Sequence, residues 1–125
     1  MATYLIRELL LEGERPMSWN TLYEQTHWGK RKEEADRVHW LVKLETKNQG
    51  LDKVAIGPVD ITVTAFFDKR PLDADNICAK MYIDGLIGWA IENDSYKYVK
   101  SVKTVTCIDR DNPRMVIEIS EEVRE

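Results

Sequence analysis

The sequence contains little cysteine, little histidine and no long apolar run, and each scarcity excludes a class of protein. Cys78 and Cys107 are the only cysteines, and neither belongs to a CxxC pair or lies near clustered histidines, which argues against a zinc site. We expect both to be buried free thiols. No apolar stretch approaches the roughly 18 residues of a membrane span. The first residues, MATYLIRELLLEGE, also lack the order of a signal peptide, so the sequence predicts a cytoplasmic protein with no membrane partner.

An excess of basic residues is also missing. Lysine and arginine total 18 against 22 aspartates and glutamates, a net charge of −4. This argues weakly against a passive nucleic-acid binder, which usually carries a basic face. The objection is limited, because the acidic charge gathers at the C-terminus and because cations neutralise an active-site acid cluster. The C-terminal glutamates are Glu118, Glu121, Glu122 and Glu125.

The hydrophobic patterns predict one α/β (α+β) domain over residues 1–125, with a single mixed sheet of about four strands and two helices. The expected order is β-α-β-α-β-β, with strands over 3–11, 59–67, 96–108 and 115–120 and helices over 30–47 and 76–88. Residues 16–28 are expected to be an irregular connection. The Asn112-Pro113 turn predicts a hairpin, with the last two strands paired antiparallel.

An acidic segment, Asp73-Ala74-Asp75-Asn76, follows the clearest strand and is expected to open the second helix with Asp75 as its N-cap. A turn with a cap is the ordinary explanation of such a pattern. However, Lys69 and Arg70 lie immediately upstream, where they could hold phosphate oxygens beside the free N–H groups of a helix start. Neighbouring carboxylates favour a shared cation, and Mg²⁺ prefers carboxylate and phosphate oxygens. The segment therefore predicts a magnesium site.

Two further charged positions have competing interpretations. Lys80 and Asp84 are four residues apart on the second expected helix, so they form either an exposed ion pair or a site lysine with its positioning acid. Asp94 precedes a strand, where a lone acid is usually a turn residue. A helix of about 13 residues would separate Asp75 from Asp94 by about 20 Å. Either the helix is shortened near Gly85 and Gly88, or Asp94 joins the site across a dimer two-fold.

The remaining candidates also have ordinary structural interpretations, which are the more frequent ones for the histidines and the aromatic residues. His27 and His39 lack partners at ligand spacing and are expected to be structural. The aromatic residues of the early connection could stack bases but are more often core; they are Trp19, Tyr23 and Trp28. Three lysines on the third expected strand are either phosphate contacts or a solvated edge; they are Lys97, Lys100 and Lys103.

Taken in order, these motifs resemble the RusA family of Holliday-junction resolvases, often carried by phages and prophages. The resemblance spans most of the chain and is carried by Lys69-Arg70, Asp73-Ala74-Asp75-Asn76, Lys80, Asp84-Gly85-Leu86 and Asn93-Asp94-Ser95. The early Pro16-Met17-Ser18-Trp19-Asn20 is similar to the family's P-x-S-x-N. Two features depart from the pattern. Three residues separate Asn76 from Lys80 where the family commonly has two, and the late acid pair is reduced to Asn93-Asp94.

The resemblance implies a homodimer that nicks two opposing strands of a four-way DNA junction. Asp73, Asp75 and Asp94 would bind Mg²⁺, with Mn²⁺ as a substitute, and Lys80 would be the essential lysine. Lys69, Arg70, Asn76, Lys97 and Lys100 are the expected nucleic-acid contacts. We therefore expect a Mg²⁺-dependent structure-selective endonuclease. The alternatives are a junction-binding or phage replication-accessory protein that does not cut, and an enzyme on small phosphorylated substrates, which the lack of a glycine-rich phosphate loop disfavours.

Overall fold

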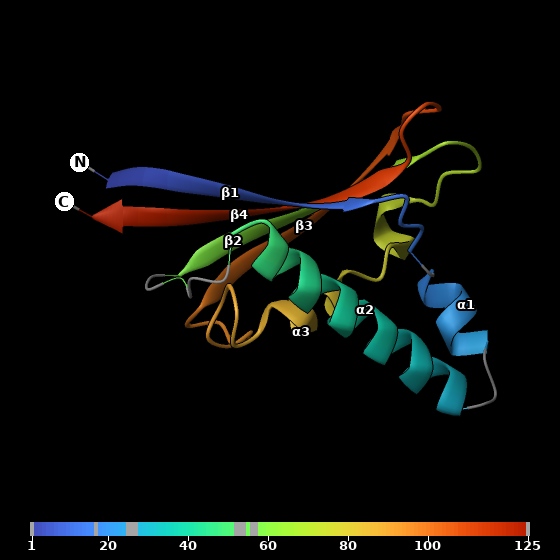
Figure 1. The fold of residues 1–125 in the computed structure, drawn as a ribbon, viewed down its shortest axis with the longest axis horizontal. Helices are drawn as coiled ribbons and strands as arrows, with labels where there is room; N and C mark the ends of the chain where they lie inside the picture. Colours follow the sequence, from blue (N-terminus) through green and yellow to red (C-terminus); the bar gives the residue numbers. More distant parts are fainter. Residues whose placement is uncertain (1, 17, 25–27, 52–54, 56–57, 125) are drawn as a thin grey trace.

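The computed structural model describes residues 2–16, 18–24, 28–51, 55 and 58–124 and has a mixed four-stranded sheet with two helices on one face (Figure 1). The elements are β1 (Ala2–Glu12), α1 (Trp19–Glu24), α2 (Trp28–Asn48), β2 (Val59–Phe67), the 3-10 helix η1 (Ala74–Asn76), α3 (Ala79–Leu86), β3 (Val99–Ile108) and β4 (Arg114–Arg124). The predicted class and single mixed sheet are confirmed. The sequence predicts only an irregular connection at 16–28, and α1 is an additional element there.

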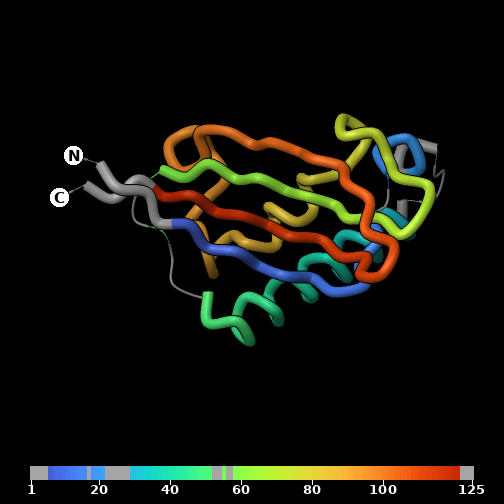
Figure 2. The backbone as a smooth tube through the Cα atoms, turned by 90° about the horizontal axis from the view of Figure 1, so that it is seen from above, coloured from blue at the N-terminus to red at the C-terminus, as the bar shows by residue number. Residues whose placement is uncertain are grey.

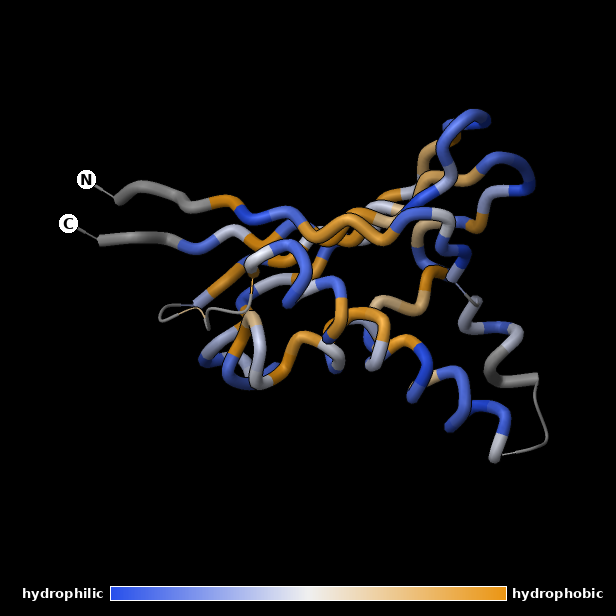
Figure 3. Tube along the Cα trace, viewed as in Figure 1, coloured by the Kyte–Doolittle hydropathy of each residue, from blue (hydrophilic) through white to orange (hydrophobic). Residues whose placement is uncertain are grey.

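The strand β2 lies inside the sheet and has the bounds that its alternating sequence predicts. Its residues are buried at every second position, from Val59 to Phe67. The strand order is β1-β4-β2-β3, which Figure 2 shows across the sheet. β2 pairs parallel with β3 and antiparallel with β4. Figure 3 shows apolar residues along the strands and in the helical layer beside them.

The predicted hairpin between the last two strands is wrong. β3 and β4 are not neighbours, because β4 lies between β1 and β2. The connecting segment crosses the end of β2, where the N–H of Asp109 donates to the carbonyl of Phe67 at 2.9 Å. β4 buries Met115, Ile117 and Ile119, whereas most of β3 is exposed or half-buried. β4 is therefore an interior strand, whereas β3 lies at the edge of the sheet.

The second predicted helix is shorter than its sequence suggests, and Asp75 is not its N-cap. Residues 74–76 form η1, Ile77 is extended, and α3 begins after Cys78. Ile77 is only 2% exposed and forms an isolated antiparallel bridge with Ser18, which holds the chain extended between the two helices. At the other end Gly88 adopts a φ of +84°, which stops α3 after Leu86.

The two main helices approach each other closely. Val38 and Val42 of α2 are buried, whereas Leu44 of the same helix is exposed. A Cβ placed on Gly85 of α3 would lie 2.9 Å from the Cβ of Val42, so only glycine permits this separation.

The third strand begins at Val99, not at Tyr96 as predicted. The carbonyl of Ser95 accepts the N–H groups of both Tyr98 and Val99, which makes a turn of the residues before the strand. Lys97 therefore lies in this turn and only Lys100 and Lys103 lie on β3. No helix among the described residues is long and apolar enough to cross a membrane.

Candidate functional site

The two carboxylates of the D-x-D pattern lie together at η1. Asp73 precedes this short helix and Asp75 lies within it, and both side chains are exposed. Asp73 makes no side-chain capping bond. Within the described residues neither carboxylate has a hydrogen-bond or ion-pair partner, so their oxygens are open to a cation. Both line a hollow of about 400 Å³, which we call the acid hollow; its lining is Trp19, Asn20, Asp73, Asp75 and Asn76.

Residues 18–20 lie against this hollow, and Ser18 is the residue that precedes α1. The hydroxyl oxygen of Ser18 accepts the N–H of Thr21 at 3.0 Å, as an N-cap does. The helix start then directs the N–H of Asn20 toward Asn76, whose Oδ1 accepts it at 3.2 Å. Two segments more than 50 residues apart in sequence thus form one wall of the site.

The basic loop after β2 is fastened to the same region. The guanidinium of Arg15 donates to the carbonyls of Lys69 (3.3 Å) and Arg70 (2.9 Å) and lies 5.1 Å from the centre of the Phe67 ring. Arg70 has a φ of +50°, a backbone conformation that residues other than glycine rarely adopt. Both basic side chains are exposed, so the loop offers two positive charges just before the acids.

Lys80 forms the exposed ion pair that its spacing with Asp84 permits. Its Nζ lies 3.4 Å from the Asp84 carboxylate, and its side chain is 65% exposed. Lys80 lines a neighbouring hollow, not the acid hollow, although Trp19 belongs to both. Lys80 therefore lies at the hollow next to the acid hollow and is already paired with Asp84.

Asp94 is not brought to the acid pair within one chain. Ala74 lies beside Thr104, whose hydroxyl donates to its carbonyl at 2.7 Å, whereas the turn at Ser95 lies beside Val99. Five strand residues separate these levels by about 17 Å. Figure 1 shows η1 beside α1 and the 87–98 segment at the opposite end of the sheet. No group of three His, Cys, Asp or Glu in the described part of the chain could hold a metal ion.

The predicted nucleic-acid contacts divide in the same way. Asn76 lines the acid hollow, with Lys69 and Arg70 just upstream. Lys97 and Lys100 are exposed at the end of the sheet where Asp94 lies. Of the residues expected at the site, two carboxylates lie at one end of the sheet and one at the other, each with cationic side chains nearby.

A partly exposed polar cluster joins the helices behind the site. The carboxylate of Glu14 accepts hydrogen bonds from Arg37 at 2.7 and 3.2 Å and from the hydroxyl of Tyr82 at 3.3 Å. Hydrogen bonds to Glu34 and Glu14 raise the pKa of Arg37, and burial raises the pKa of Tyr82. The cluster therefore joins the end of β1 to α2 and α3, and Arg15 continues from it to the basic loop.

Several predictions about single residues have clear outcomes. Cys78 is a buried free thiol whose pKa is raised by burial, whereas Cys107 is only half-buried. His39 is half-buried on α2, and its Nε2 has no hydrogen-bond partner in the described structure. His27 and the side chains of Tyr23 and Trp28 lie outside the described residues. Trp19 lines the acid hollow, so the core interpretation does not hold for it.

Sequence reasoning missed the positioning role of Arg15, because nothing in its local pattern indicates carbonyl partners more than 50 residues away.

No protein-family model matches the chain, and no curated protein matches it either. The resemblance to the RusA family therefore stays a prediction from the ordered motifs.

Proposed function

We propose that this protein is a Mg²⁺-dependent endonuclease that cuts branched DNA, with the four-way Holliday junction as its substrate. The observation that carries the proposal is the meeting of the two motif segments. Asn20 of the early segment donates to Asn76 of the acidic segment, and both line the hollow that contains Asp73 and Asp75. A purely local explanation of D-x-D-N, such as a helix cap, does not account for this meeting, because the capping bond is absent.

The residues present fit a hydrated magnesium ion. Mg²⁺ is usually held by one or two carboxylates together with water and substrate phosphate, and Asp73 and Asp75 supply two carboxylates with no protein partner among the described residues. Bound there, Mg²⁺ would supply an activated water and stabilise charge on the scissile phosphate. Asn76 and Asn20 fix the wall of the hollow through their hydrogen bond.

The cations around the hollow have a positioning role in this proposal. Lys69 and Arg70 extend from a loop that Arg15 holds in place, so they can bind backbone phosphates of the DNA at the acid pair. Lys80 contributes a further charge from the adjoining hollow. Phosphate oxygens would compete with Asp84 for this lysine, because the exposed pair is weak.

In this proposal the protein acts as a homodimer, because Asp94 does not reach the acid pair of its own subunit. A two-fold axis that places the 94–100 segment of one subunit on the acid hollow of the other would complete two composite sites. Lys97 and Lys100 would arrive with Asp94 and add phosphate contacts. Two such sites match a four-way junction, whose opposing strands are related by symmetry.

One observation favours a second candidate, a junction-binding protein that does not cut. Within one subunit the described residues supply only two of the three expected acids at the hollow. If no dimer brings Asp94 to these two acids, the site binds Mg²⁺ weakly, and the protein binds the junction without cutting it.

A synthetic junction separates these candidates. The wild-type chain is incubated with a labelled four-way junction and, as a control, with linear duplexes of the same arm sequences, each in Mg²⁺ and in EDTA. We expect paired nicks in opposing junction strands in Mg²⁺, none in EDTA, and intact linear duplexes. Junction binding without nicks in Mg²⁺ or Mn²⁺ would support the non-catalytic candidate and overturn the nuclease.

A further inference from the structure

Two hollows follow one another along the seam between α2 and α3, and the acid hollow adjoins the first of them. The acid hollow shares Trp19 with a middle hollow of about 420 Å³, and the middle hollow shares His39 and Asp84 with a third of about 230 Å³. The middle hollow is lined by Trp19, Arg31, Lys32, Ala35, His39, Cys78, Lys80, Met81 and Asp84. The seam is therefore one continuous surface that leads away from the acid pair.

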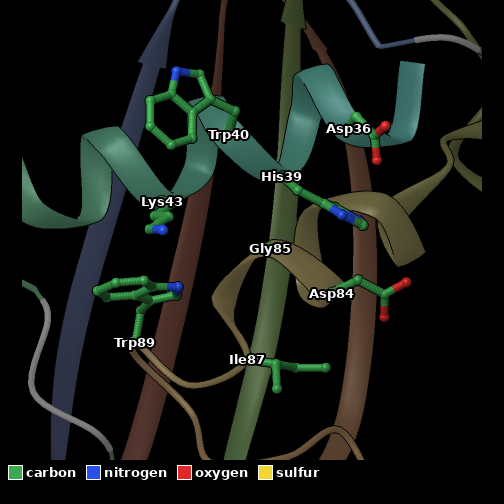
Figure 4. A pocket seen from close by; sticks show the side chains of 8 residues that line it. All are labelled: Asp36, His39, Trp40, Lys43, Asp84, Gly85, Ile87 and Trp89. Atoms are coloured by element: carbon green, nitrogen blue, oxygen red, sulfur yellow. The ribbon is translucent and has the colours of Figure 1, made fainter. Parts of the chain in front are cut away.

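Two tryptophans mark the far end of the seam. Trp40 of α2 is 64% exposed, and Trp89, just after α3, faces it across the third hollow (Figure 4). Lys43 lies between the rings, 5.5 Å from the centre of Trp40 and 4.5 Å from that of Trp89. Lys47 lies 4.5 Å from Trp89 as well. Neither lysine has a carboxylate partner among the described residues.

Two buried nitrogen atoms in the seam also lack partners. Nε of Arg31 and Nε2 of His39 are inaccessible to solvent and have no hydrogen-bond partner in the described structure. Both side chains line the middle hollow. The middle hollow is therefore lined by polar as well as apolar side chains.

The charge of the seam selects the kind of ligand. Five cations border the middle and third hollows: Arg31, Lys32, Lys43, Lys47 and Lys80. The lining includes two carboxylates, Asp36 and Asp84, which are paired with Lys32 at 3.1 Å and Lys80 at 3.4 Å. The surplus is positive although the whole chain is negative. A second copy docked here by a two-fold would bring like charges together, whereas an anionic strand would neutralise them.

We propose that the α2–α3 seam binds an unpaired strand of nucleic acid, with bases stacked on Trp40 and Trp89 and phosphates held by Lys43 and Lys47. Exposed aromatic rings interleaved with cations are the means by which proteins hold single strands without sequence preference. A duplex keeps its bases stacked inside and cannot offer them to the two rings. From Arg31 to Lys47 the seam is about 24 Å long at 1.5 Å per helical residue, room for several nucleotides. The binding needs neither metal nor acid pair, so it holds or fails separately from cleavage.

The test measures binding of a fluorescent oligothymidylate to the full chain by anisotropy, in EDTA and at low salt. We expect the wild type to bind it more tightly than a blunt duplex. Trp40→Ala and Trp89→Ala should each weaken binding about tenfold or more, since a base–aromatic stack contributes about 1–3 kcal/mol. Lys47→Gln should reduce the slope of log K against log[salt] by about 0.7, because one counterion fewer is released from the single strand.

Two controls keep the result interpretable. Tyr96→Ala removes an aromatic ring that is 83% exposed outside the seam and should bind like the wild type. Asp111→Asn, which changes an exposed acid in the loop before β4 and outside the seam, should also bind the oligonucleotide normally. Circular dichroism checks that each variant is folded, and Trp40→Phe, which keeps an aromatic ring, should retain most of the affinity.

Three results would overturn the proposal. One is equal affinity of the wild type and both tryptophan variants for the oligonucleotide. Another is tighter binding of duplex than of single strand. The third is a change of oligomeric state in Trp40→Ala by sedimentation with oligonucleotide binding unaltered, which would assign the seam to a second copy of the chain.

Discussion

The variant Asp75→Asn is expected to bind the four-way junction normally and to lose at least about 100-fold in Mg²⁺-dependent cleavage. Outer-shell partners of a metal already contribute about 10–100-fold, and a direct ligand should contribute no less. Asparagine keeps the shape of the side chain and removes its charge. Asp75 is exposed and is not the N-cap of η1 or α3, so the fold should not suffer. Asp111→Asn, an exposed acid in the loop before β4, is the matched control and should cut like the wild type.

Mixing variant subunits tests whether the partner supplies Asp94. Asp75→Asn and Asp94→Asn should each be inactive alone. In a mixed dimer with shared sites, one site carries both substitutions and the other carries none, so single nicks should reappear. If each subunit used its own Asp94, every site would stay defective and no nick would return. Wild-type rates in Asp75→Asn would refute the assignment of the acid hollow as the catalytic site.

The largest expected effect on stability is that of Ile117→Ala in β4. Ile117 is fully buried and lies opposite Leu9 of β1 and Val63 of β2, so its side chain packs between both neighbouring strands. Deleting three carbon atoms from such a position costs about 2–5 kcal/mol of unfolding free energy. Urea unfolding followed by circular dichroism measures this loss.

The control for this prediction is Val102→Ala on the edge strand β3. Val102 is 47% exposed, and surface substitutions usually change stability by no more than about 0.5 kcal/mol. Together the two variants test the strand order, because an interior β4 and an edge β3 predict unequal losses. Equal losses would contradict the order β1-β4-β2-β3.

The parts of the fold that the sequence predicts are those set by local pattern. The alternation from Val59 to Phe67 fixes both the strand and its buried face, because only one face of the sheet is covered by helices. The helix α2 follows from its periodic apolar residues. Local pattern does not predict which strands are neighbours in the sheet. The Asn112-Pro113 turn indicates a reversal of the chain but not that the reversed strand passes β2 and inserts beside β1.

The candidate site shows the same limit. The acidic segment, the basic loop and the early Ser18-Trp19-Asn20 segment are visible as motifs. The meeting of the acidic and early segments at one hollow depends on the Ser18–Ile77 bridge. That bridge also shortens α3, a tertiary effect that overrides the local helix pattern. The separation of Asp94 from the acid pair is already expected from the sequence, and the parallel pairing of β2 and β3 maintains it although α3 is short.

The most direct measurement of the central claim places the metal without relying on activity. Fe²⁺ is bound in place of Mg²⁺, ascorbate and peroxide are added, and the radicals formed cut the polypeptide close to the ion. We predict cuts near residues 19–20 and 73–76, a further cut near Asp94 if the dimer supplies it, and suppression of all of them by excess Mg²⁺ or by Asp73→Asn with Asp75→Asn. A chain that is cut elsewhere, or equally in the double variant, would contradict the assignment of the acid hollow as the metal site.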